Sequence, residues 1–372
     1  MSMMNTRFLF NVFLKGVLIF VLLNLLVVAL PAGLGKLSLY NVILDGRVRF
    51  PFGETPEKSY NISLFDLDAM FASHVISGTR KGGDEFRVIL IGDSATWGTL
   101  QRPEETIAGM LEASRLTTCS GQEVHFYNLG YPTVSLVKDL MVLDYARQYD
   151  PDLIIWPLTM ESFPTDKQLA SPIVANNAAR VDDLTERYDL PLDPGDPELV
   201  RQNFWERTLI GQRRPLADLI RLQLYGVPWS ATGVDQIYPS DYTRAQTDLS
   251  TDTSYHGQPG PVLDETHMAF PIYNAVLEAA GEIPIILVNE PILISAGENS
   301  ELRYNFMYPR WAYDQWRVMM QEQAGSAGWT YIDLWNLVPA GEFTNSAIHI
   351  TPAGVSLLVE QLKPIIEAQT CP

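Results

Sequence analysis

The chain has 372 residues, of which 47% are hydrophobic and 10% aromatic, so it can bury the core of a large domain and is not a disordered polypeptide. Its net charge of −18 and sequence pI near 4.6 argue against nucleic acid as a partner, because the phosphate backbone would be repelled. Cys119 and Cys371 lie too far apart in the sequence for a CxxC metal or redox motif. They can pair in an oxidising compartment or remain free, and the sequence leaves both outcomes open.

A long apolar segment at the N-terminus predicts a membrane anchor. Residues 16–35 carry no charge, and at ~1.5 Å per residue a helix of this length crosses a hydrocarbon core about 30 Å thick. Arg7 and Lys15 lie at its start, which favours a cytoplasmic N-terminus and an extracytoplasmic remainder. Basic residues also follow its far end and weaken that bias, namely Lys36, Arg47 and Arg49.

Cleavage of this segment as a signal peptide is the alternative interpretation. Residues 29–32, Ala-Leu-Pro-Ala, are a poor small-x-small cleavage site, so we predict an uncleaved, single-pass anchor over residues 1–35. The protein would then reside in the cell membrane, with its larger part outside the cytoplasm.

Beyond the anchor, the sequence predicts a juxtamembrane segment, residues 36–85, and an α/β domain, residues 86–372. The juxtamembrane segment has little periodicity apart from an amphipathic stretch at residues 64–71. In the domain, strand and helix patterns alternate, which is typical of a mainly parallel sheet in a three-layer α/β/α fold. The expected strands end near residues 91, 128, 158, 288 and 334, and the expected helices cover residues 103–116, 135–149, 269–280, 310–324 and 351–367.

The alternation is interrupted by an insertion at residues 163–265, which is rich in Pro, Asp and Asn and contains one expected helical stretch at residues 198–225. A structureless loop of this length is rare in a compact domain, so we predict a cap or side wall over the site. Four aromatic side chains of the insertion can stack on sugar rings or pack internally, namely Trp205, Tyr225, Trp229 and Tyr238.

The most informative stretch is residues 88–98, where four strand-forming residues run into Gly92-Asp93-Ser94 and Gly98 follows four residues after the serine. A serine on a tight turn at the carboxyl edge of a parallel sheet lies where open α/β folds place ligands. The alternative is that Ser94 only caps a helix. We interpret Asp93 as a brace for the loop rather than as a nucleophile.

A nucleophilic serine needs a base, and His349 is the best placed of the five histidines. It lies on the expected turn between the last strand and the last helix, which begins at Thr351-Pro352. The other four lie in a strand, beside helices or in the insertion, namely His74, His125, His256 and His267.

Two motifs resemble those of the SGNH, or GDSL, hydrolase family: Gly92-Asp93-Ser94 with Gly98, and residues 349–354, His-Ile-Thr-Pro-Ala-Gly. The resemblance implies a flavodoxin-like α/β/α fold in which Ser94 is the nucleophile and His349 the general base. It also implies that the amides of Ser94 and Gly130 stabilise an oxyanion. The sequence contains no HExxH, phosphate-loop or GxGxxG motif, so we expect no metal and no cofactor.

The chain departs from the family pattern at the residue that would orient the histidine. The family commonly has an aspartate three residues before the histidine, and this chain has Ser346 there, preceded by Asn345. Either side chain can hold the imidazole ring by a hydrogen bond without supplying a charge. Glu290, at the end of a strand, and Glu342, before the turn, are the alternative orienting residues.

A second departure concerns the oxyanion donors. The family has Gly-x-Asn-Asp after the third strand, where this chain has residues 159–162, Thr-Met-Glu-Ser. Glu161 therefore replaces the donor asparagine, and it could donate a hydrogen bond only when protonated. Thr159 and Asn289 are the alternative donors.

These features predict a membrane-anchored, extracytoplasmic serine esterase or O-acyl(acetyl)transferase. On the family resemblance, its substrate would be an acylated small molecule or a cell-surface polysaccharide, with a membrane acyl-transfer protein as a partner. The alternative is an impaired SGNH-like domain that binds glycan or scaffolds a membrane complex. Retention of Ser94 and His349 together favours the enzyme, because a binding module needs neither.

Overall fold

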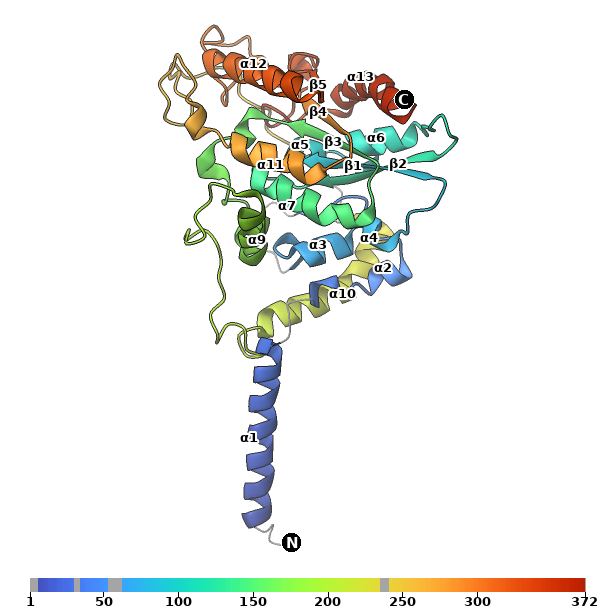
Figure 1. The fold of residues 1–372 in the computed structure, drawn as a ribbon, viewed down its shortest axis with the longest axis vertical. Helices are drawn as coiled ribbons and strands as arrows, with labels where there is room; N and C mark the ends of the chain where they lie inside the picture. Colours follow the sequence, from blue (N-terminus) through green and yellow to red (C-terminus); the bar gives the residue numbers. More distant parts are fainter. Residues whose placement is uncertain (1–5, 30–33, 53–61, 235–240, 372) are drawn as a thin grey trace.

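The computed structural model describes residues 6–29, 34–52, 62–234 and 241–371 (Figure 1). The strands are β1 (Glu85–Gly92), β2 (Glu123–Gly130), β3 (Leu153–Leu158), β4 (Ile285–Asn289) and β5 (Thr330–Asp333). The helices are α1 (Thr6–Ala29), α2 (Tyr40–Ile43), α3 (Leu67–Ser73), α4 (Val75–Gly78), α5 (Ser94–Trp97), α6 (Ile107–Ala113), α7 (Leu136–Ala146), α8 (Pro172–Ala175), α9 (Ala178–Tyr188), α10 (Arg213–Thr232), α11 (Phe270–Ala280), α12 (Arg310–Ala327) and α13 (Pro352–Thr370).

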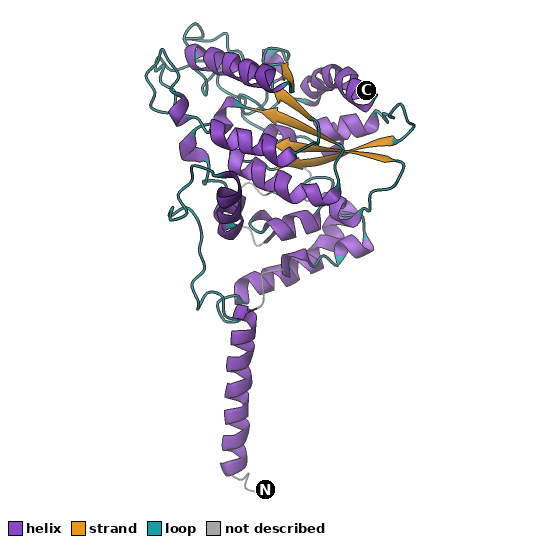
Figure 2. Ribbon diagram, viewed as in Figure 1, coloured by secondary structure: helices purple, strands orange, loops and turns teal. Residues whose placement is uncertain are grey.

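The five strands form one parallel sheet in the order β2-β1-β3-β4-β5 (Figure 2). This is the flavodoxin-like order, and it confirms the predicted α/β/α fold. The chain reverses its direction of strand addition between β1 and β3, so the loops after these strands diverge and leave space at the carboxyl edge. Ser94 follows β1 at that point.

Alternating side chains of β1 face two separate apolar layers. Ile89 and Ile91 belong to the core that also contains the buried faces of α7 and α11. Val88 and Leu90 belong to the core built with α6 and α13. The period of two along the strand therefore buries both faces of the sheet, which explains the continuous apolar run in the sequence.

The segment before β1 packs on the domain rather than only connecting it to α1. All seven residues of α3 are buried, and Phe71 stacks on Tyr145 of α7 with ring centroids 4.3 Å apart. Phe50 is fully buried in the same core, and its carbonyl accepts a hydrogen bond from Trp97 Nε1 at 2.7 Å. Residues 47–52 thus support the turn that carries Ser94.

The insertion does not form the predicted cap as a whole. Helices α8 and α9 pack against α7, and α10 packs against α2 at the end of the domain nearest α1 (Figure 1). The helix expected at residues 198–225 is displaced to Arg213–Thr232 and continues through Pro228. Residues 244 and 245 of the insertion do lie beside the turn that holds His349, since Ala245 N donates to Thr344 O at 2.8 Å and Arg244 Nη2 donates to Gly341 O at 2.7 Å.

Helix α1 projects from the domain, and none of its residues is buried (Figure 1). Its 24 residues have a mean hydropathy of 2.7 over the most apolar window, which is sufficient in length and composition for a membrane span. An N-terminal signal sequence has the same properties.

A disulfide joins Cys119, in the loop before β2, to Cys371, after α13, with the Cα atoms 5.1 Å apart. The sequence left their pairing open, and the structure pairs them. The bond closes a loop of 252 residues and ties the end of α13 to the loop between α6 and β2.

Candidate active site

The turn after β1 fixes the position of Ser94. Asp93 caps α5 by accepting a hydrogen bond from Ala95 N at 2.8 Å, so the cap is Asp93 and Ser94 is the first helical residue. Gly92 has φ +150°, and a Cβ there would lie 2.3 Å from Thr96 Oγ1. A side chain at Gly92 would therefore push α5 away from the end of β1.

Arg49 closes the other end of this short helix. Its guanidinium donates to Gly98 O at 2.9 Å and to Gln101 O at 3.0 Å, and it lies 4.0 Å from the centroid of the Trp97 ring. The buried guanidinium therefore has its hydrogen-bond acceptors among the backbone carbonyls just after the end of α5.

The structure brings Ser94, His349 and Asn345 into one hydrogen-bonded chain. His349 Nε2 lies 2.7 Å from Ser94 Oγ, and His349 Nδ1 lies 2.8 Å from Asn345 Oδ1. Since an amide oxygen only accepts, Nδ1 carries the proton and Nε2 is free to accept from the serine hydroxyl. This is the tautomer that a general base for Ser94 requires.

A closed turn holds the histidine in this position. Thr344 N donates to His349 O at 2.8 Å, and Phe343 and Ile350 pair as an isolated bridge. Thr351 then caps α13 by accepting from Gly354 N, so the histidine is held between a short turn and a helix start.

Burial lowers the pKa of His349 to about 4. No carboxylate hydrogen-bonds to its ring among the described residues, and its partner Asn345 is neutral. The imidazole is therefore uncharged at neutral pH and available as a base, but an imidazolium formed there would gain no ionic stabilisation.

The other predicted orienting residues do not contact the ring. Glu342 accepts a hydrogen bond from Thr351 Oγ1 and thereby supports the start of α13. Ser346, which occupies the family position of the aspartate, forms no hydrogen bond with the imidazole ring. Asn345, one residue earlier, forms that hydrogen bond instead.

Glu290 lies instead in a buried ionic cluster beneath the Ser94 turn, which we define as Asp93, Lys138, Asp139 and Glu290. Lys138 Nζ lies 2.6 Å from Asp139 Oδ1 and donates to Gly92 O, also at 2.6 Å. The ammonium thus ties α7 to the last residue of β1.

Burial shifts the pKa of the acidic groups in this cluster. It raises the pKa of Asp93 to about 6, against the opposing influence of Lys138. Burial, reinforced by the charge of Asp93, also raises the pKa of Glu290 well above its usual range, which favours the neutral acid. Glu290 is buried in this cluster, and Asn345, not Glu290, hydrogen-bonds to His349 Nδ1.

The geometry at Gly130 differs from the prediction that its amide stabilises an oxyanion. Gly130 N donates to Asn128 Oδ1 at 3.0 Å, so the N–H is already engaged. A Cβ at this position would lie 2.6 Å from Trp97 N, which means that the glycine allows β2 to approach α5 closely.

The three candidate replacements for the family asparagine are also engaged elsewhere. Thr159 Oγ1 is hydrogen-bonded to Tyr308 Oη, and Asn289 Nδ2 donates to Asp333 Oδ1 at 2.8 Å. Glu161 forms an ion pair with Lys167 and lies 3.1 Å from His256 Nε2.

The charge of Glu161 excludes a donor role. Burial by itself would raise the pKa of Glu161, but the hydrogen bond with His256 and the charge of Lys167 lower it overall. The side chain is therefore a carboxylate at neutral pH and has no proton to donate.

Sequence reasoning missed two supporting residues, Asn128 and Lys138. Asn128 Nδ2 donates to Thr96 O at 3.0 Å and so fastens β2 to α5. Lys138 is followed by Asp139, and both are buried in α7 among apolar residues. That mismatch was the available signal, because a lysine is almost never fully buried without a partner.

No family model matches the chain, and no curated protein matches it in sequence. Solved structures similar to this chain include a carbohydrate acetylesterase family member from Sinorhizobium meliloti, at 14% identity and a TM-score of 0.37, covering 76% of this chain and 98% of that one.

Two further solved structures are similar at the same level. A lipolytic protein of the G-D-S-L family from Veillonella parvula has 11% identity and a TM-score of 0.35, with 75% of this chain and 97% of that chain covered. A catalytic mutant of an acetylxylan esterase from Geobacillus stearothermophilus has 12% identity and a TM-score of 0.36, with 79% and 99% covered. The structural neighbours thus include carbohydrate and acetylxylan esterases and a lipolytic protein of the G-D-S-L family.

Proposed function

We propose that this protein is a serine ester hydrolase of the SGNH type. The observation that carries the proposal is the 2.7 Å contact between Ser94 Oγ and a neutral His349 Nε2, at the carboxyl edge of a parallel sheet. In this mechanism Ser94 Oγ attacks the carbonyl carbon of an acyl ester while His349 Nε2 takes the hydroxyl proton. His349 returns that proton to the departing alcohol, and water then releases the acyl group by the same route.

Asn345 orients His349 without stabilising its positive charge, so the unit works as a serine–histidine dyad held by an amide. The Ser94 amide remains the proposed oxyanion donor, since the first N–H groups of a helix have no partner within it. An alcohol acceptor in place of water would make the same acyl-enzyme an O-acyltransferase. On the family resemblance, we extend the proposal to O-acetylated cell-surface polysaccharide as substrate.

We further propose that α1 anchors the protein in the cell membrane with the domain outside the cytoplasm. Arg7 and Lys15 at the start of α1 support this orientation. The disulfide between Cys119 and Cys371 supports an oxidising compartment, because such bonds rarely persist in the cytosol.

Labelling with a fluorophosphonate tests the nucleophile directly, since the reagent reacts with activated serines. We expect the wild-type chain to be labelled and to hydrolyse p-nitrophenyl acetate or an acetylated xylan. Ser94→Ala removes labelling and lowers hydrolysis on the order of 10⁴-fold. Ser346→Ala, on the same turn as His349 but outside the hydrogen-bonded chain, is the matched control and keeps both activities.

Absence of labelling together with wild-type hydrolysis no faster than that of Ser94→Ala would refute the enzyme. The glycan-binding or scaffolding alternative would then stand in its place.

A further inference from the structure

Apolar side chains are exposed at one end of the domain, and they take no part in the proposed catalytic mechanism. Outside α1, the large apolar residues exposed among the described residues concentrate in residues 37–48 and 200–234. Elsewhere in that part of the chain they are Tyr242, Val262 and Val318. We call the first two segments together the proximal face, because α2 and α10 lie at the end of the domain nearest α1 (Figure 1).

Helix α10 packs against the domain with one of its faces. Its residues Leu219, Leu222 and Gly226 are buried. The opposite side exposes Ile220 and Leu224, four residues apart, and Leu224 is 69% exposed. An apolar stripe at helical spacing on the outer side is unexplained by packing within the domain.

Helix α2 extends this stripe into a continuous surface. Leu39 N donates to Gln223 Oε1 at 2.6 Å, and Ser230 Oγ donates to Gly46 O at 3.2 Å, so residues 37–48 are held against α10. Val42 is 84% exposed, and Ile43 beside it is also exposed. The two segments therefore present their apolar side chains as one unit.

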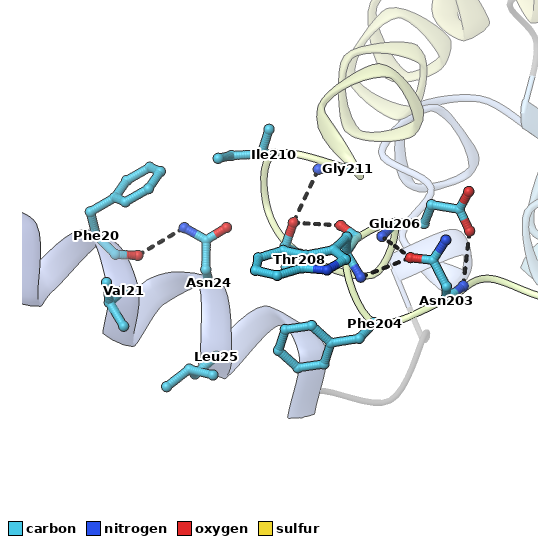
Figure 3. A pocket seen from close by; sticks show the side chains of 11 residues that line it. Phe20, Val21, Asn24, Leu25, Asn203, Phe204, Glu206, Thr208, Ile210 and Gly211 are labelled. Atoms are coloured by element: carbon cyan, nitrogen blue, oxygen red, sulfur yellow. Dashed lines mark hydrogen bonds between the residues drawn. The ribbon is translucent and has the colours of Figure 1, made fainter.

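The loop before α10 reaches α1 itself. A groove of about 590 Å³ lies between residues 20–25 of α1 and residues 203–211, with Phe204 and Ile210 on the loop side (Figure 3). Trp205 also lines this groove. Trp205 is 75% exposed although it is one of the largest apolar side chains in the chain. Tryptophan is enriched at membrane–water interfaces, because its ring is apolar and its N–H can reach water.

The charge of the proximal face is opposite to that of the whole protein. The acidic residues of this face are Asp45, Glu206 and Asp218, in a chain whose net charge is −18. The basic residues outnumber them, namely Arg47, Arg201, Arg207, Arg213, Arg214 and Arg221. Arginines beside an apolar stripe suit a surface of lipid acyl chains bordered by anionic phosphate groups.

We propose that the proximal face binds the lipid bilayer, so that α10 and α2 lie in the membrane interface beside α1. This inference rests on the proposed anchoring by α1, because continuity with α1 identifies the bilayer as the occupant. The domain would then be held against the membrane instead of swinging on a tether, and the direction in which Ser94 faces would be fixed.

The test places a fluorophore on the proximal face of the full chain, reconstituted in vesicles containing anionic phosphatidylglycerol. Both native cysteines are in the disulfide, so Leu224→Cys and Leu39→Cys each introduce the single reactive thiol for an NBD label. Val262→Cys is the matched control, because Val262 is an equally exposed apolar residue, at 74%, outside the proximal face.

We expect NBD at residues 224 and 39 to emit at shorter wavelength in vesicles than in detergent-free buffer, and to be quenched by lipids spin-labelled near the headgroup. NBD at residue 262 keeps the emission of a water-exposed probe and is not quenched. In the Leu224→Cys chain, Arg213→Gln together with Arg214→Gln weakens the quenching in anionic vesicles more than in phosphatidylcholine vesicles.

Three results would overturn the inference. If the chain floats with vesicles but residues 224 and 39 behave like residue 262, α1 is an anchor and the proximal face does not bind lipid. A blue shift without lipid quenching would indicate a second copy or another protein on this face. If the chain does not float with vesicles, the anchoring proposal fails as well, whereas the Ser94 labelling result is unaffected.

Discussion

Two groups of polar side chains flank the Ser94 turn, and they differ in charge and in exposure. On one side, the half-buried His349 and the exposed Asn345 form a neutral hydrogen-bonded chain. On the other, the buried ionic cluster of Asp93, Lys138, Asp139 and Glu290 holds three acidic residues around one ammonium. The carboxyl groups of this cluster therefore do not lie beside His349 Nδ1, where a catalytic triad has its acid. Asn345 occupies that position.

This difference shows that an acidic residue near the nucleophile can orient the histidine only if it contacts the imidazole ring. Having several carboxyl groups nearby is not enough. Lys138 draws the cluster toward Gly92 O and so fixes the backbone beneath Ser94. Asn345 alone reaches the ring of His349. We infer that the charged group stabilises the fold of the turn and that the neutral group tunes the base, and three substitutions separate these roles.

The largest effect is expected for Lys138→Met, which removes the cation from the buried cluster. Loss of one partner of a buried ion pair costs about 3–5 kcal/mol of unfolding free energy, because the remaining charge has no compensation. Chemical denaturation followed by circular dichroism measures this change. Lys138→Met combined with Asp139→Leu should recover part of the loss, and an unaltered midpoint in the single variant would contradict a structural role for the cluster.

A smaller effect, confined to catalysis, is expected for Asn345→Ala. The ring of His349 loses the acceptor that fixes its tautomer, so kcat for ester hydrolysis should fall about 10–100-fold, with the thermal midpoint little changed. Ser346→Ala, at the neighbouring position, should retain wild-type kcat. Equal losses in both variants would show that the turn, and not the amide contact, matters.

The smallest effect is a shift of the pH profile in Asn345→Asp. Burial lowers the pKa of His349 to about 4, so the wild-type rate should stay constant below neutrality and fall only near that pH, where the base becomes protonated. A carboxylate on Nδ1 favours the imidazolium and raises the pKa. Because residue 345 is exposed, the acid limb of kcat/KM should move upward by about one unit. An unmoved limb would mean that the rate reports another group.

Much of the fold could be predicted from the sequence because its signals are local. Apolar runs that stop at Gly92 or at residues 128 and 158 mark strands, and helical periodicity marks α7, α11 and α12 between them. The alternation of these elements leads to a parallel sheet, and the structure has that sheet with the strand order of the predicted class. The Ser94 turn was recognisable for the same reason, since its glycines, acid and serine are neighbours in the chain.

The hydrogen-bond partners at the site could not be predicted from local patterns, because they depend on the directions of side chains within turns and on the packing of segments distant in the sequence. The choice of Asn345 over Ser346 follows from the direction of side chains on a turn closed by Thr344 and His349. The engagement of the Gly130 amide follows from the close packing of β2 against α5.

The buried cluster and the pairing of Cys119 with Cys371 likewise join segments that local patterns cannot relate. Local periodicity specifies where elements begin and end, but hydrogen bonds and charges at a site are set by the three-dimensional positions of side chains. The sequence therefore determined the sheet and the serine–histidine pair, and the tertiary structure determined which groups support that pair.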